Sequence, residues 1–246
     1  MNVEPIHIDS QVLGRCVLSL QELNPSLPFK DFETAYLKEH DPGYVYCKVP
    51  LERMPDVHFL ESQGFNLIEC QIKFSVKLLK PYDLNPFQGY IYEPVEREED
   101  LEVVLGIAAE TFTHDRWRVD PLLAPRLAGE RYKAYVRNSF IDNKERLFLL
   151  RDKRSRSPVA FRTHRMISDK EVLFLLGGVD PRFKNMGLGL ISEFNEFNEL
   201  ISQGCQKGTT HISAANYPIF NLDMNRSGFR VVTTFAVMRK LYTYGA

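Results

Sequence analysis

The chain has 246 residues, of which 26% are charged and 44% hydrophobic, and its formal net charge is −1. This composition suits a globular protein with one large domain or two small ones, and the balanced charge excludes the strongly basic proteins that bind nucleic acid. The first ten residues lack the basic start and apolar run of a signal peptide, and no apolar stretch reaches the roughly 20 residues of a membrane span. We therefore expect a cytoplasmic protein without a membrane or nucleic-acid partner.

The cysteines and histidines show no spacing typical of a metal site. Cys16, Cys47, Cys70 and Cys205 lie far apart and form no C-x-x-C pair. A disulfide framework or a zinc site is therefore not expected, and we predict free thiols and no bound metal.

Strand-like and helix-like patterns alternate in the first 85 residues. We expect strands over 16–20, 44–49 and 65–79, and helices over 29–39 and 55–62. The turn-rich segment 83–89 follows the last strand and predicts a domain boundary, which divides the chain into an N-terminal α/β domain over 1–85 and a second domain over 86–246.

The second domain repeats this alternation over a longer stretch. We expect strands over 90–93, 146–150, 159–164, 172–178, 210–214 and 229–241, and helices over 99–111, 122–139, 188–202 and 218–226. A strand, a helix, a Gly-Phe turn and a long strand occur over 44–78 and again over 210–241. This repetition indicates either a degenerate partial copy of one domain or chance, because Gly-Phe is a common turn from helix to strand.

A glycine-containing loop between an expected strand and helix is the strongest functional signal. Gly187 and Gly189 directly precede and open the helix over 188–202, where bare N–H groups and the positive end of the helix dipole attract a diphosphate. Lys184 and Arg182 can add charge-assisted contacts. Leu190 and Ile191 exclude a P-loop, and Ser192 stands where a dinucleotide-binding fingerprint needs its third glycine.

The longer pattern resembles the signature of the GNAT acetyltransferase superfamily. Its residues are Val179 and Pro181 at the strand end, Lys184 where the signature has Gln or Arg, and Gly187-x-Gly189, followed downstream by Asn216 and Gly228-Phe229. The resemblance implies a mixed α+β fold with a mostly antiparallel mixed sheet flanked by helices. It also implies an acetyl-CoA co-substrate, bound by these residues: Val179, Lys184, Asn185, Met186, Gly187, Leu188, Gly189 and Asn216.

A closer resemblance is to the dTDP-fucosamine (dTDP-4-amino-4,6-dideoxygalactose) acetyltransferase family, which acetylates a nucleotide-linked amino sugar. It is carried by 60–65, 115–118 and Leu175-Leu176. The resemblance implies that the acceptor enters beside the segment 114–118. Arg116 and Arg118 suit a diphosphate and Trp117 can stack on a base or sugar, although an indole packed on the core remains an equal alternative.

The resemblance also implies direct attack of an amine on the thioester. It implies a backbone oxyanion donor at the end of the 172–178 strand, for which we choose Gly177, while His114 is a candidate base. The family commonly uses a tyrosine in the helix before Gly-Phe as the general acid. No tyrosine stands at that place here, and the segment from Asn216 to Gly228 carries an extra residue. Asp223 replaces the tyrosine only if its pKa is raised, a solvated carboxylate being the alternative, and Tyr217 is a second candidate.

Two other functions stay open. One is an N-acetyltransferase for another amine, such as a peptide terminus or an antibiotic, for which we expect an acidic pocket. The other is a GNAT-fold module that binds acyl-CoA without chemistry. The sequence also leaves open whether the protein forms a homodimer.

Overall fold

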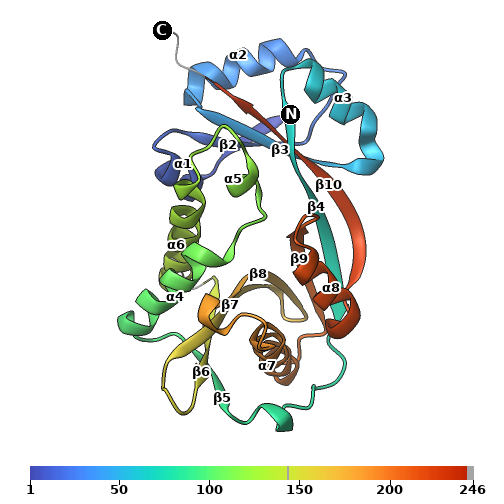
Figure 1. Ribbon diagram of the computed structural model, residues 1–246. Helices are drawn as coiled ribbons and strands as arrows, with labels where there is room; N and C mark the ends of the chain where they lie inside the picture. The colour runs from blue at the N-terminus through green and yellow to red at the C-terminus, as the bar shows by residue number, and fades with distance from the viewer. Residues whose placement is uncertain (143, 243–246) are drawn as a thin grey trace.

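The computed structural model describes residues 1–142 and 144–242. The strands are β1 Asn2–Pro5, β2 Val17–Gln21, β3 Tyr44–Pro50, β4 Asn66–Lys77, β5 Tyr90–Pro94, β6 Arg146–Asp152, β7 Pro158–Ser168, β8 Glu171–Val179, β9 Lys207–Ser213 and β10 Arg230–Leu241. They form one ten-stranded sheet in the order β1-β2-β3-β10-β4-β9-β8-β7-β6-β5 (Figure 1). Pairing is antiparallel except for β2 with β3 and β8 with β9 within the described residues, so the predicted mixed, mostly antiparallel sheet is confirmed.

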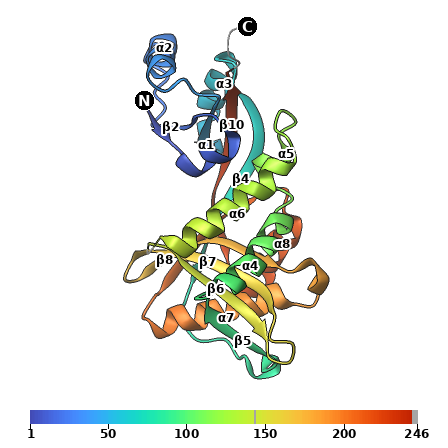
Figure 2. The same cartoon turned by 90° about the vertical axis from the view of Figure 1, so that its left-hand side faces the viewer.

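Helices cover both faces of this sheet. They are α1 His7–Leu13, α2 Phe29–His40, α3 Met54–Ser62, α4 Glu98–Thr111, α5 Arg116–Val119, α6 Arg126–Ile141, α7 Leu188–Ser202 and α8 Tyr217–Leu222. In the C-terminal half, α4 and α6 lie on one face and α7 on the other (Figure 2). The alternation of strand side chains explains both layers, since Leu149 packs with α4 and α6 whereas the next residue, Leu150, packs with α7.

Every predicted helix and strand is present, with ends shifted by a few residues. The predicted helix over 122–139 begins instead at Arg126, because Pro125 precedes the first helical turn. Three short elements were missed, namely β1, α1 and α5. Within the described residues, no helix is both long and apolar enough to cross a membrane.

The two halves of the chain share the centre of the sheet. Strand β4 lies between β10 and β9, and β10 lies between β3 and β4, with antiparallel registers on each side. The core beneath α2 and α3 consequently contains Ala236 and Met238 of β10 beside Leu60 and Phe65. The last strand of the chain therefore completes the first half, and β4 completes the second (Figure 1).

The parallel strands β8 and β9 separate after a short ladder. They pair only from Glu171 to Leu173 and from Lys207 to Thr209. Beyond this point β8 stays hydrogen-bonded to β7 as far as Val179, and β9 stays with β4 as far as Ser213. Each strand follows its outer partner, so the sheet opens into a V between them. We call this opening the V.

We predict that Gly208→Ala destabilises the protein. A Cβ atom at position 208 would lie 2.2 Å from Cε2 of the buried Phe174, inside the short ladder that closes the V. Overpacking of this kind costs about 1–3 kcal/mol, measurable by urea denaturation. Gly106→Ala is the control, because no heavy atom lies within 4 Å of its Cβ position. Equal stability of the Gly208→Ala variant and the wild type would contradict this packing, and Phe174→Leu should restore part of the loss.

Candidate functional site

The predicted diphosphate loop connects β8 to α7 at the open end of the V. The Asp180 N–H donates to the Val159 carbonyl over 2.9 Å, and a 3₁₀ turn over Pro181–Phe183 follows. Asn185 and Gly187 then adopt left-handed backbone angles, with φ of 67° and 76°. These two residues turn the chain so that α7 begins at Leu188, whose side chain is buried.

The first amides of α7 are unpaired within the part of the chain that the structure describes. The N–H groups of Gly187, Leu188, Gly189 and Leu190 find no acceptor among residues 1–142 and 144–242, and the first bond of the helix runs from Ile191 to Gly187. The residues from Lys184 to Gly187 are exposed. The start of a 15-residue helix is thus an open cluster of donors at the positive end of the helix dipole.

The two glycines leave this cluster uncovered for different reasons. Gly187 needs its left-handed φ of 76°. Gly189 has no such need, and a Cβ atom there would meet only Val179 Cγ2 at 3.7 Å, an ordinary contact. A side chain at position 189 would fit among the protein's own atoms. It would collide with a diphosphate bound to the amides. The loop therefore fits the diphosphate of a coenzyme A thioester.

The cations of the loop differ in availability. The Arg182 guanidinium lies 2.6 Å from the Asp180 carboxylate, and this contact lowers the pKa of Asp180. Lys184 is exposed and has no ion pair among the described residues, so it is the free cation beside the amides. Met186 is also exposed, and Asn216 caps α8 through its side-chain oxygen, which accepts from the Ile219 N–H over 3.5 Å.

Gly177 places a backbone donor on the rim of the V. Asp180 pairs with Val159 by a hydrogen bond, so alternation along β7 and β8 makes Phe161 with Gly178 the next bonded pair. Gly177 and Arg162 are then a non-bonded pair, and the Gly177 N–H points away from β7. The neighbouring Leu176 N–H is used by the Thr163 hydroxyl at 3.0 Å, beside a bulge at Leu175. The Gly177 N–H therefore points into the V.

A buried charge cluster lies next to Gly177, on the α7 side of the sheet. Nη1 of Arg162 is 3.0 Å from the Cβ position of Gly177. Arg162 binds Glu196 at 2.8 Å and Glu193 at 3.3 Å, and His164 Nδ1 lies 2.8 Å from Glu196. Sequence reasoning missed this cluster. Its signal was the two glutamates three residues apart on the apolar face of α7.

Asp223 joins this cluster as a buried acid. It is 3% exposed, and its Oδ1 has no hydrogen-bond partner among the described residues. Burial and the charge of Glu193 raise the pKa of Asp223 to about 8, against the opposing effect of Arg162. The alternative of a solvated carboxylate is therefore wrong. The extra residue of this segment is accommodated by a π-helical turn over Asp223–Ser227, whereas Tyr217 is 69% exposed.

The acceptor segment 114–118 is largely packed into the protein. Trp117 is fully buried and stacks on Tyr44 with ring centroids 6.1 Å apart. Arg116 is buried, lies 3.2 Å from Asp9 and covers the Tyr46 ring. The stacking role expected of Trp117 is corrected, because the indole has no free face, and the charge of Arg116 is already paired.

The other two residues of this segment stay accessible. His114 and Arg118 are half-buried. Asp115 caps α5 through the Arg118 N–H, and Arg118 Nη1 donates to the Pro125 carbonyl over 3.3 Å. His114 and Arg118 therefore remain candidates for contact with an acceptor.

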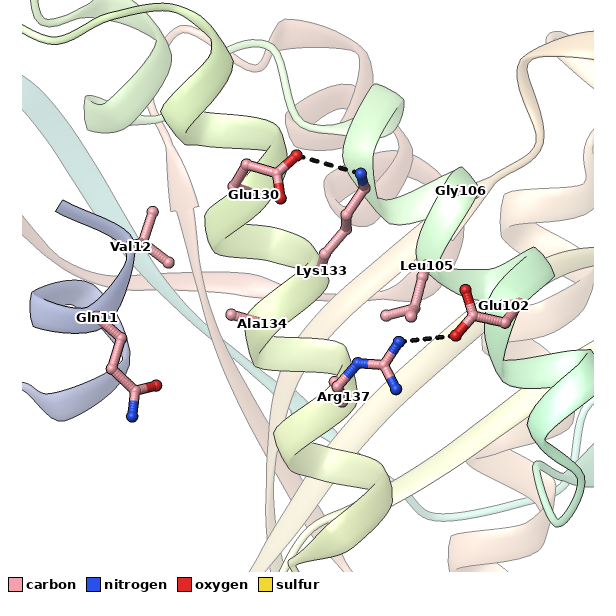
Figure 3. Close-up of a pocket in the computed structure, with 9 residues that line it drawn as sticks. All are labelled: Gln11, Val12, Glu102, Leu105, Gly106, Glu130, Lys133, Ala134 and Arg137. Atoms are coloured by element: carbon pink, nitrogen blue, oxygen red, sulfur yellow. Dashed lines mark hydrogen bonds and ion pairs between the residues drawn. The ribbon is translucent and has the colours of Figure 1, made fainter. Parts of the chain in front are cut away.

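A further cavity lies elsewhere in the fold. A space of about 730 Å³ opens between α1, α4 and α6. Figure 3 shows that its charges are paired, Arg137 with Glu102 at 2.7 Å and Lys133 with Glu130 at 3.2 Å. Its lining includes neither the residues from Lys184 to Leu190 nor a strand of the V.

The N-terminal half has an equivalent of the V that is nearly closed. The parallel strands β2 and β3 end at a cavity of about 80 Å³, lined by Gln21 and Cys47 and bordered by a contact between Arg53 and Asp56. Ligand pockets are typically about 300–1,000 Å³. The acidic Asp31 lies in the first turn of α2, which disfavours an anion.

No cluster suited to a metal is found among residues 1–142 and 144–242. All four cysteines are free.

Comparison with known proteins identifies the fold. No protein-family model matches the sequence, and no curated protein matches it. A GCN5-related N-acetyltransferase from Sphaerobacter thermophilus superposes with a TM-score of 0.68 at 13% identity, over 99% of this chain and 77% of that chain. One from Kribbella flavida gives 0.61 at 15% identity, over 94% and 82%. A tandem GNAT protein from the clavulanic acid biosynthesis pathway gives 0.61 at 11% identity, over 94% and 76%. The chain therefore has the GNAT fold, and the likeness extends over both of its halves.

We predict that Gly189→Asp weakens coenzyme A binding at least tenfold while the protein stays folded. The new carboxylate would stand at the helix start, where it stabilises α7 but repels a diphosphate. Isothermal titration calorimetry measures the change and should give one site per chain for the wild type. Gly89→Asp is the control, because it adds the same charge at an exposed position with no heavy atom within 4 Å. Unchanged affinity in Gly189→Asp would rule out the loop as the diphosphate site.

Proposed function

We propose that the protein is an acetyl-CoA-dependent N-acetyltransferase that transfers the acetyl group to an amine by direct attack. The observation that carries this proposal is the row of bare amides at the start of α7, placed at the open end of the V. The GNAT fold of the chain supports it. Acetyl-CoA, once bound, supplies an activated acetyl group as a thioester.

The diphosphate is assigned to the amides from Gly187 to Leu190 and to the Lys184 ammonium. Val179, Asn185, Met186 and Asn216 form the surrounding contacts. The Gly177 N–H is assigned to the acetyl carbonyl oxygen, on which negative charge develops in the transition state. One well-aimed donor of this kind contributes roughly 3–4 kcal/mol to the transition state.

The proton balance assigns a role to Asp223. The amine nitrogen bonds to the carbonyl carbon, the carbon–sulfur bond breaks, and the thiolate takes up a proton. Asp223 holds a proton at neutral pH because its pKa is about 8. The amine must lose its proton before attack, which costs only about 1.4 kcal/mol at pH 7 for an amine with a pKa near 8. His114 is the candidate relay for that proton.

We propose a nucleotide-linked amino sugar as the acceptor and the cytoplasm, where acetyl-CoA is available, as the site of the reaction. The resemblance of 60–65 and 115–118 to dTDP-fucosamine acetyltransferases supports this choice, with Arg118 as the remaining candidate for a diphosphate. We also propose that residues 1–85 are a degenerate partial copy of the domain over 86–246. The succession of β3, α3, Gly64-Phe65 and β4 matches that of β9, α8, Gly228-Phe229 and β10, and the small cavity of the first half fits lost function.

The proposal is tested by thiol release from acetyl-CoA with a panel of amines that includes dTDP-4-amino-4,6-dideoxygalactose. Turnover with an amino sugar nucleotide is the expected result. Turnover only with peptide termini or antibiotics would replace the acceptor. Tight coenzyme binding without thiol release for any amine would identify a binding module instead.

We predict that Asp223→Asn lowers kcat about 100-fold and removes its alkaline limb. Wild-type kcat should fall above pH 8, where Asp223 loses its proton, and asparagine keeps the shape without an acidic proton. The carboxyl pKa is 3.8 in a free chain and about 8 here. Folding therefore takes up a proton, and wild-type stability falls as the pH rises through this window.

The variant should lack both pH dependences, as kcat profiles and thermal unfolding at several pH values will show. Unchanged kcat would remove Asp223 from the reaction. Asp169→Asn, at the exposed turn between β7 and β8, serves as the control.

A further inference from the structure

One face of the central sheet gathers polar side chains from both halves of the chain. Successive residues of β4 alternate, so Phe74 and Val76 pack in the core under α7, whereas Glu69, Gln71 and Lys73 point to the opposite face. The register adds neighbours from two other strands. Lys73 lies opposite His211 and Gln71 opposite Ser213 in β9, while Lys48 of β3 shares a row with Glu69 across β10.

This face borders the V opposite α7. His211 and Ser213 follow Thr209, the last residue of β9 that pairs with β8. The bare amides of α7 and the Asp223 cluster belong to the other face. An acyl donor held at α7 and an acceptor on the polar face therefore meet at the gap between β8 and β9, where the Gly177 N–H points. The segment that contains Trp117 and Arg116 packs beside this face through Tyr44 and Tyr46.

Two buried side chains here have polar atoms without partners. Glu69 is 7% exposed and Gln71 is 9% exposed. The Gln71 amide donates to Glu69 Oε2 over 3.1 Å, but Glu69 Oε1 and Gln71 Oε1 have no partner among the described residues. A buried unpaired polar atom costs roughly 1–3 kcal/mol, so these two acceptors are suited to a donor supplied by a ligand. An amine is such a donor.

The same face carries two lysines, and the carboxylates of Glu69 and Asp9 act electrostatically on one of them, Lys48. The ion pairs around it join Asp9 to Arg116 and Arg131, and Asp120 to Arg239; Arg131 also lies 3.7 Å from Asp115. Lys48 and Lys73 take part in no ion pair among residues 1–142 and 144–242.

Both lysines act on His211, which lies opposite Lys73 in β9. Desolvation by the surrounding protein and the charges of Lys48 and Lys73 lower the pKa of His211, although its side chain is exposed. Burial and Arg116 lower the pKa of Lys48 to about 8, although its side chain reaches solvent. Burial is the main cause of the raised pKa of Glu69; Arg116, a hydrogen bond from Ser213 and the charge of Lys48 oppose it, and Asp115 adds to it. This face therefore presents positive charge at the two lysines. The hydrogen-bond acceptors of Glu69 and Gln71 lie a short distance away along β4.

We propose that the acceptor is an amine that also bears an anionic group, a phosphate or a carboxylate. Lys48 and Lys73 bind the anionic group, and Glu69 and Gln71 accept hydrogen bonds from the amine. The inference rests on the proposed function. It makes the N-terminal half, through β3 and β4, part of the acceptor site.

The test compares three amino sugars that differ in charge. Glucosamine carries no anionic group and is the reference. Glucosamine 6-phosphate adds a phosphate to it, and muramic acid adds a carboxylate. We expect kcat/KM with acetyl-CoA to be at least tenfold higher for one of the two anionic sugars. Lys48→Met and Lys73→Met should each lower the ratio of kcat/KM for that anionic sugar to kcat/KM for glucosamine by about tenfold to hundredfold, with unchanged coenzyme A affinity. Lys30→Met, at an exposed position on α2, is the control.

Calorimetric titration of the same sugars into the protein with coenzyme A provides a readout without turnover. Lysine-dependent binding of an anionic sugar without acetyl transfer would overturn the proposed function and support the anionic subsite. Turnover without preference for either anionic sugar, or an equal loss for all three sugars in the lysine variants, would overturn the subsite and leave the proposed function standing. The hydrogen bond from the amine to Glu69 is tested separately. Glu69→Gln should raise KM for all three sugars and leave coenzyme A affinity unchanged.

Discussion

The separation of β8 from β9 is the constraint on which the site depends. The two strands pair only as far as Leu173 and Thr209, because each then follows its outer neighbour, β7 or β4. A sheet that stayed closed here would bond the Gly177 N–H to β9. Because the sheet opens, the Gly177 N–H, the start of α7 and the polar residues of β9 all border one gap. The strands β8 and β9 form the two sides of this gap.

The exchange of β4 and β10 gives the N-terminal half a reason to be retained. Its own parallel pair, β2 with β3, ends at a cavity of about 80 Å³, and its helix α2 begins with an acidic turn. Yet β4 is hydrogen-bonded to β9, the strand that forms one side of the V, and Lys48 and Glu69 lie on the polar face. In the proposed site, the first half thus contributes side chains for the acceptor, and the loop proposed for the coenzyme belongs entirely to the second half.

Local patterns predicted the elements well, and they predicted the loop. The apolar spacing of α7 and the glycines at 187 and 189 place a bare helix start from neighbouring residues alone. The environments of single side chains depend on distant partners and could not be predicted in this way. Trp117 is buried where Tyr44 stacks on it, and Asp223 is an acid because it is buried and lies beside the charge of Glu193. The interleaving of β4 and β10 was equally hidden, since a repeat in the sequence does not say which strands pair.

The central claim is that the bare amides at the start of α7 hold the diphosphate of a coenzyme A thioester. A crystal structure of the protein with coenzyme A tests it most directly. The account predicts diphosphate oxygens within hydrogen-bond distance of the N–H groups of Gly187, Leu188 and Gly189, with the thiol end in the gap beside Gly177. A coenzyme bound in the cavity between α1, α4 and α6, or a loop from 184 to 189 that closes over its own amides, would contradict it.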